Sequence, residues 1–148
     1  MSDDELADQI ERFFSVHARI DTIARQELRI TPSERMALLH LSSGITSPTD
    51  LSRHLGMTSA GVTNLLDRLV ESGHVTRARH KDDGRRILVL LTKRGIQAHL
   101  RLHTVASELA AVANAMGDDG TACVVDFLDR ATAVLHDRRE ADERLARR

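Results

Sequence analysis

The sequence contains a single cysteine, Cys123, among 148 residues. One cysteine excludes an internal disulfide framework and a cysteine-rich zinc module. A lone thiol usually fills a buried apolar position on a helix, and we expect this of Cys123. A thiol switch between subunits is the alternative.

Long apolar runs and enzyme motifs are also lacking. No stretch approaches the roughly 20 apolar residues of a membrane span, and the acidic start MSDDELADQ lacks the basic and apolar regions of a signal peptide. We therefore expect a cytoplasmic protein with no membrane partner. The chain has no phosphate-binding glycine loop, no G-x-S-x-G and no H-E-x-x-H motif, so we expect neither an enzyme nor a cofactor.

The formal net charge is only −1, but the charge is unevenly distributed along the chain. Residues 31–95 hold ten Lys and Arg against six Asp and Glu, a surplus of four positive charges. Residues 1–30 and 96–148 carry net charges of −3 and −2. The basic surplus therefore lies in the middle of the chain, where a nucleic-acid partner would need it.

Helix-capping motifs divide this middle segment. Residues 31–34 (TPSE) combine a capping hydroxyl, a proline in the first turn and a glutamate at capping-box spacing, and residues 47–50 (SPTD) repeat the pattern. Thr58 then predicts the start of a helix over 59–72. Only two residues separate this helix from the preceding one, so the chain must turn sharply between them.

The hydrophobic period changes after residue 73. Residues 74–79 and 86–91 read as strands around the turn-like segment 81–85 (KDDGR), which predicts a β-hairpin. Thr92 caps a further amphipathic helix that breaks at 117–120 (GDDG).

Apolar residues at helical spacing also run over 4–26, and a last helix continues into a polar tail. The predicted fold is mainly α with a small β-hairpin wing, a winged helix-turn-helix with additional helices at both ends of the chain.

In a helix-turn-helix, the second helix lies in the major groove of DNA. Here Asn64 could bond adenine, while Ala60 and Gly61 would let the backbone approach closely. A first turn rich in serine and threonine is also common in helices that do not bind DNA, because these side chains cap the helix. The candidate DNA-binding residues of the two helices are Ser47, Thr49, Thr58, Ser59, Ala60, Gly61, Thr63, Asn64 and Arg68.

The hairpin strengthens the prediction of DNA binding. Its cations can reach phosphates or a narrow minor groove from a projecting loop, although a solubilising charged turn is the alternative. These candidates are Arg77, Arg79, Lys81, Arg85 and Arg86.

The motifs resemble the winged helix of the multiple antibiotic resistance regulator (MarR) family. Residues 83–85 (DGR) followed by 91–95 (LTKRG) are similar to the family's wing signature, Asp-x-Arg and then Leu-Thr-x-x-Gly. Residues 57–64 with 67–69 resemble its recognition helix.

The resemblance implies roles for particular residues. Arg85 would enter the minor groove at the wing tip, and Asp83 would brace the wing by pairing with an arginine. Many relatives have arginines in the recognition helix where this chain has Ser59 and Asn64, which leaves the base preference open.

The helices at both ends carry apolar faces too long for a small winged helix to cover. Residues 1–30 and 96–148 are therefore predicted to form a helical dimerisation region around the DNA-binding module 31–95, in one compact domain. The resemblance implies the same homodimer, which would present two recognition helices to a pseudo-palindromic site in double-stranded DNA.

The resemblance also implies a small-molecule effector, bound between the dimer helices and the winged helix. Candidate lining residues are Phe13, Phe14, His17 and Met36, with core packing as the alternative. The absence of Trp and Tyr weighs against an aromatic ligand.

His99 and His103 lie four residues apart on one helix and could both face a zinc ion. Two ligands do not complete a site, and Arg35, beside the possible ligand Glu34, opposes a cation, so we expect no metal. The sequence predicts a transcriptional regulator, a repressor that a small molecule could release. A zinc-responsive regulator and a winged helix used only for protein interaction are the alternatives.

Overall fold

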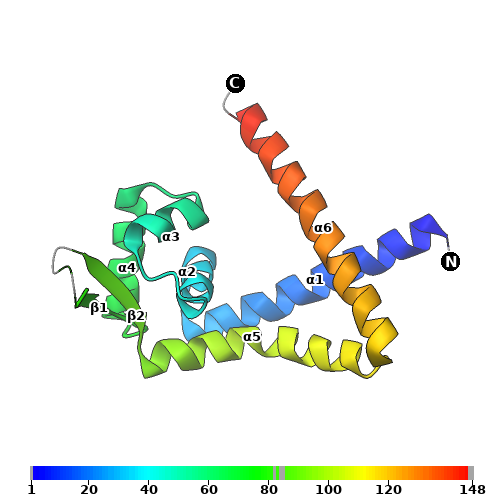
Figure 1. Cartoon of the computed structure of the whole chain (residues 1–148), viewed down its shortest axis with the longest axis horizontal. Coiled ribbons are helices and arrows are strands. Elements are labelled where there is room, and N and C mark those ends of the chain that lie inside the picture. Colours follow the sequence, from blue (N-terminus) through cyan, green and yellow to red (C-terminus); the bar gives the residue numbers. More distant parts are fainter. Residues whose placement is uncertain (1, 82, 84–85, 147–148) are drawn as a thin grey trace. The chain divides into compact units, whose positions relative to one another are not determined.

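The computed structural model describes residues 2–81, 83 and 86–146 (Figure 1). Its helices are α1 (Asp3–Leu28), α2 (Pro32–Ser42), α3 (Pro48–Leu55), α4 (Ser59–Glu71), α5 (Lys93–Asn114) and α6 (Gly117–Ala146), and its strands are β1 (Val75–Arg79) and β2 (Ile87–Leu91). The chain divides into two units, the first ending at His103 and the second beginning at Thr104. The predicted mainly α fold with one hairpin is confirmed.

Polar caps start the three helices that follow α1. Thr31 Oγ1 accepts a hydrogen bond from Glu34 N (3.2 Å), and Glu34 Oε2 accepts one from Thr31 N (2.7 Å), which completes the predicted capping box. Ser47 Oγ accepts from Asp50 N (3.4 Å) at α3, and Thr58 does the same for α4. These caps satisfy N–H groups that no carbonyl within the helix reaches, and all three predicted helix starts are confirmed.

The core of the first unit lies where α2, α3, α4 and the hairpin meet (Figure 1). Leu38, Leu51 and Leu66, one from each helix, are at most 1% exposed. Because α4 buries one stripe of side chains at helical spacing, its opposite face is left to solvent. The buried apolar residues of this core are Ile30, Ala37, Leu38, Leu41, Leu51, Val62, Leu65, Leu66, Leu69, Val75, Val89 and Ala98.

The hairpin is anchored at its base. β1 and β2 pair antiparallel, with Val75 opposite Leu91. Val75 and Val89 are buried in the core, and Val89 N also donates a hydrogen bond to Thr46 O (2.9 Å) in the loop between α2 and α3. The wing is therefore fixed to the helix-turn-helix by packing and by backbone pairing.

Thr92 links the end of the hairpin to α5. Its Oγ1 accepts a hydrogen bond from Gly95 N (3.1 Å), as the predicted cap requires, and donates one to Gly73 O (2.6 Å). Gly95 packs so closely on the backbone of His74 that a Cβ at this position would lie 2.0 Å from the His74 carbonyl oxygen. Only glycine fits this junction without displacing the chain.

The predicted helix break at 117–120 is wrong, because α5 ends at Asn114, α6 begins at Gly117, and only residues 115–116 lie between them. Gly117, the first residue of α6, adopts a φ of +81°, which suits glycine. Asp118 and Asp119 lie in the first turn of α6, where carboxylates interact favourably with the helix dipole. Among the helices of the described residues, none combines the length and the apolar character that crossing a membrane requires.

Candidate nucleic-acid interface

The exposed face of α4 presents small and polar side chains. Ser59 and Ala60 are exposed in its first turn, and Thr63 and Asn64 follow on the side opposite the core. Thr63 Oγ1 donates to Ser59 O (2.9 Å), so this hydroxyl is engaged within the helix. Asn64 has no hydrogen-bond partner among the residues that the structure describes, and its amide is available to a ligand.

The turn before α4 is as sharp as predicted. Gly56 ends α3 with a φ of +62°, and Ser52 Oγ donates to Met57 O (2.6 Å) across the turn. On α3, Thr49 is exposed, whereas the Ser47 hydroxyl is occupied by capping. Of these two candidates, Thr49 therefore has the more accessible side chain.

An ion pair joins the first strand of the wing to α4. Arg77 Nη2 donates to Asp67 Oδ1 at a distance of 2.7 Å. The sequence predicts Arg77 as a DNA-binding cation but gives no sign of this pair, because the relative orientation of α4 and β1 depends on tertiary packing. In the free chain, Arg77 is therefore engaged by a carboxylate of α4.

The remaining cations of the wing are exposed. Arg79, Lys81 and Arg86 form no ion pair with any residue in the described ranges. Asp83 is exposed and its carbonyl oxygen accepts a hydrogen bond from Arg86 N (2.9 Å), while its pairing with an arginine side chain stays a prediction. Arg85, the predicted wing-tip residue, lies outside the described residues.

A second ion pair involves the other arginine of α4. Arg68 Nε lies 3.0 Å from Glu34 Oε1, and the Glu34 side chain is only 7% exposed. The same carboxylate completes the cap of α2. Arg68, which the sequence predicts to bind DNA, therefore connects α4 to α2. The capping motif indicated one partner of Glu34, and the second depends on tertiary packing.

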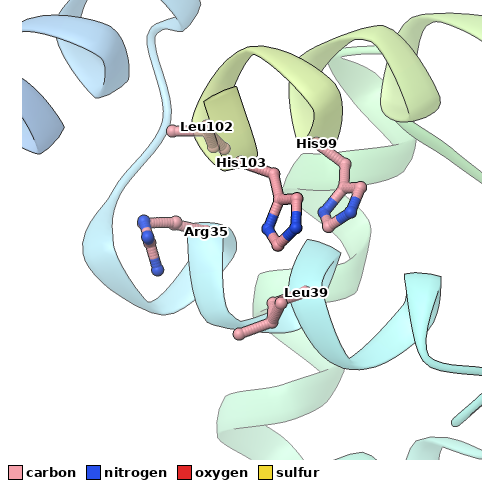
Figure 2. A pocket seen from close by; sticks show the side chains of 5 residues that line it. All are labelled: Arg35, Leu39, His99, Leu102 and His103. Carbon is pink, nitrogen blue, oxygen red and sulfur yellow. The ribbon is translucent and has the colours of Figure 1, made fainter. Parts of the chain in front are cut away.

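A small cavity of about 20 Å³ lies between α2 and α5, lined by Arg35, Leu39, His99, Leu102 and His103 (Figure 2). Arg35 forms an ion pair with Asp21 of α1, which also pairs with Arg25. Burial raises the pKa of Asp21, but hydrogen bonds and charges from Arg25 and Arg35 outweigh it, so the pKa falls below 3.8. The cavity is thus lined by α2 and α5, and α1 is connected to it through the ion pair between Asp21 and Arg35.

The two histidines of the cavity lie side by side on α5 (Figure 2), with ring centroids 5.4 Å apart. Burial, together with the charges of His103 and Arg35, lowers the pKa of His99. Arg35 lines the same cavity, and its positive charge opposes a metal ion there. In the described ranges, no three His, Cys, Asp or Glu side chains are grouped so as to hold one.

The predicted effector residues lie on α1 and α2. Phe13 and Phe14 are about half exposed, and the Phe13 ring lies 6.0 Å from Phe14 and 6.3 Å from His17, measured between centroids. Met36 is 37% exposed. None of the four lines the cavity beside Arg35, and their role in binding an effector stays a prediction.

Large apolar side chains are exposed along the helices outside the winged helix. Cys123 is also exposed, so the prediction that it is buried is wrong. The reason is that α6 contributes no buried residue among those described. Exposed large apolar residues of these helices include Leu6, Phe13, Phe14, Val16, Ile20, Ile23, Leu100, Leu109, Val112, Met116, Val125, Phe127, Leu128, Val134, Leu135 and Leu145.

Comparison with known proteins identifies relatives of the winged helix. Residues 30–86 match the model of the MarR family. The chain is 43% identical to the HTH-type transcriptional repressor YetL of Bacillus subtilis over 49 residues. The match covers 33% of this chain and 29% of YetL. It is 32% identical to the uncharacterized HTH-type transcriptional regulator YfiV of the same organism over 79 residues. This match covers 48% of this chain and 49% of YfiV. The matches thus span less than half of either relative.

Solved structures extend the similarity beyond the winged helix. The chain resembles the S. aureus MepR–DNA complex with a TM-score of 0.64 and 19% identity, over 89% of this chain and 98% of that one. At this level of identity the similarity concerns the fold, which is a winged helix-turn-helix with flanking helices. The predicted fold class is therefore confirmed.

Proposed function

We propose that this chain, whose residues 30–86 match the MarR family model, is a sequence-specific transcriptional regulator that binds DNA as a homodimer. One observation carries the proposal: the winged helix combines an exposed polar face on α4 with exposed cations on the wing. MepR, which shares the fold, has been solved with DNA, and this supports DNA as the partner. The name of YetL, a repressor, favours repression over activation.

The two surfaces have different tasks in this proposal. The first turns of α4 enter the major groove, where Ser59 and Asn64 reach base edges and Ala60 allows close approach. Arg79 and Arg86 contact phosphates or the adjacent minor groove, which supplies affinity with little sequence information. The polar helix therefore reads the sequence, and the wing supplies most of the charge.

The homodimer follows from the exposed apolar faces of α1, α5 and α6. A single chain would leave these faces in water at a cost of roughly 25 cal/mol per Å² of apolar surface. A second copy would cover them in a two-fold arrangement, so that each dimer presents two recognition helices. The operator is then a pseudo-palindrome with half-sites about one helical turn apart.

Release by a small molecule is the regulatory part of the proposal. The cavity beside Arg35 is large enough for about one water molecule, but His99 also lines an adjoining open groove of about 410 Å³. Leu41, Thr46 and Leu90 line this groove as well, so a bound molecule would contact both the wing and the start of α5. Such a molecule could shift the winged helix against the dimer helices.

Salt-dependent binding to a random-sequence duplex tests the proposal. The logarithm of the affinity should fall steeply and linearly with the logarithm of the salt concentration, between roughly 50 and 200 mM. Replacing both Arg79 and Arg86 by Ala should reduce the slope by about two. The control replaces Arg130 and Arg138 of α6 by Ala, with the same loss of charge and no expected change. Absence of binding at low salt would instead favour a protein-interaction module.

A further inference from the structure

We propose that Asp67 determines specificity, by withholding Arg77 from DNA of arbitrary sequence and by accepting a hydrogen bond from cytosine in the operator. The inference rests on the proposed function, because it assumes that α4 enters the major groove. It concerns a carboxylate on a surface where a simple DNA-binding helix would carry positive charge.

The position of Asp67 places it on the reading face of α4. It lies four residues after Thr63 and three after Asn64, so the three side chains share one exposed stripe. A carboxylate on this stripe is repelled by the phosphates on both sides of the groove. Asp67 therefore weakens binding to any duplex that does not offer it a hydrogen-bond donor.

The ion pair with Arg77 adds to this effect. Arg77 Nη2 lies 2.7 Å from Asp67 Oδ1, and the two side chains are 39% and 54% exposed. An exposed pair of this kind is weak enough to break, and Arg77 must leave it to reach a phosphate. The affinity for DNA of arbitrary sequence depends almost entirely on such cations. The ion pair therefore lowers this affinity more than it lowers the affinity for the operator.

A DNA sequence that offers Asp67 a hydrogen-bond donor can offset this loss of affinity. Once Arg77 moves to a phosphate, the Asp67 carboxylate needs a new donor, and the N4 amino group of cytosine provides one in the major groove. The other major-groove groups of a G·C pair, the O6 and N7 atoms of guanine, are acceptors and would repel it. Asp67 therefore favours duplexes with a cytosine, and not a guanine, at its position in each half-site.

Asp67→Asn tests the inference because it removes the charge and preserves the shape. The variant should bind a random duplex about two- to fivefold more tightly than the unaltered chain, the factor expected for a surface ion pair. The variant's gain in affinity for an operator selected from random duplexes should be smaller. The ratio of the affinity for the operator to the affinity for random duplex should therefore fall. Asp67→Ser should act in the same direction. Asp126→Asn, which breaks the similar Asp126–Arg130 pair on α6, is the matched control and should change neither affinity.

The outcomes separate the two proposals. If the unaltered chain binds no DNA at low salt, the proposed function fails. If it binds, but Asp67→Asn leaves the random affinity unchanged or lowers it, or raises both affinities equally, only the role of Asp67 is overturned. A lower affinity together with a lower melting temperature would make the Asp67–Arg77 pair a structural brace between α4 and the wing.

Discussion

Arg68 of α4 and Glu34 of α2 form an ion pair, with 3.0 Å between Nε and Oε1, in which the carboxylate is almost fully buried. Because Glu34 also accepts a hydrogen bond from Thr31 N, one side chain both caps α2 and holds α4. The position of the proposed recognition helix thus depends on a residue that has no contact with DNA in the proposal.

Glu34→Ala should lower the free energy of unfolding by about 2 kcal/mol, since it removes the cap and the ion pair together. Arg68→Ala should cost less, because the Arg68 side chain is 57% exposed and solvent screens its charge. Urea denaturation of both variants measures the difference. Glu140→Ala on α6, which breaks the exposed pair with Arg144, is the control. An equal or larger loss for Arg68→Ala would contradict this account.

Gly61→Ala should separate stability from DNA binding. An added Cβ would lie 3.3 Å from the Met57 and Thr58 side chains, which would have to move by a few tenths of an ångström. The gain in helix propensity of up to about 1 kcal/mol should therefore be offset, and the stability should change little. If the backbone approaches DNA at Gly61, the affinity should fall while the melting temperature changes little. Gly95→Ala is the contrasting variant, because its Cβ would clash with the His74 carbonyl and unfold the junction. Unchanged DNA affinity in Gly61→Ala would mean that this turn stays clear of the duplex.

Asn64→Ala should reduce binding in a sequence-dependent way. If the amide reads a base, the loss should be about 1–3 kcal/mol on the selected operator and should vanish when one particular base pair is changed. Affinities for a panel of single-position operator variants measure this. An equal loss on every duplex would make Asn64 a contact to the DNA backbone.

The stability of the fold should decrease below neutral pH. His74 is 1% exposed, and burial and the charge of Arg94 lower its pKa below 6.5, against the opposing effect of Glu34. The unfolded chain therefore binds the proton more readily. Stability should be complete above about pH 6.5 and should fall as the pH drops from there towards the folded-state pKa. His40 and His99, whose pKa values are also lowered, should add to the same trend.

Unfolding free energies measured between about pH 8 and pH 5 check this prediction. In His74→Asn, the asparagine amide can replace His74 Nδ1 in the hydrogen bond with Ser72 Oγ. The unfolding free energy of this variant should depend less on pH. The same dependence in the variant and the unaltered chain would assign the effect to other groups.

Features set by neighbouring residues were predictable from the sequence, and features set by packing were not. The caps at Thr31, Ser47 and Thr58 each depend on residues within four positions, and all are present as predicted. The partners of Arg68 and Arg77 depend on how α4 meets α2 and β1, which local patterns do not encode. Cys123 was expected to be buried because a lone thiol usually is, but the burial of a helical position depends on what covers it.

Selection of bound duplexes from a random pool tests the central claim most directly, because it examines DNA reading and dimer symmetry together. The account predicts enrichment of an inverted repeat whose half-sites lie about one helical turn, roughly 10 base pairs, apart. Failure to enrich any sequence, or enrichment of a single site without two-fold symmetry, would contradict it.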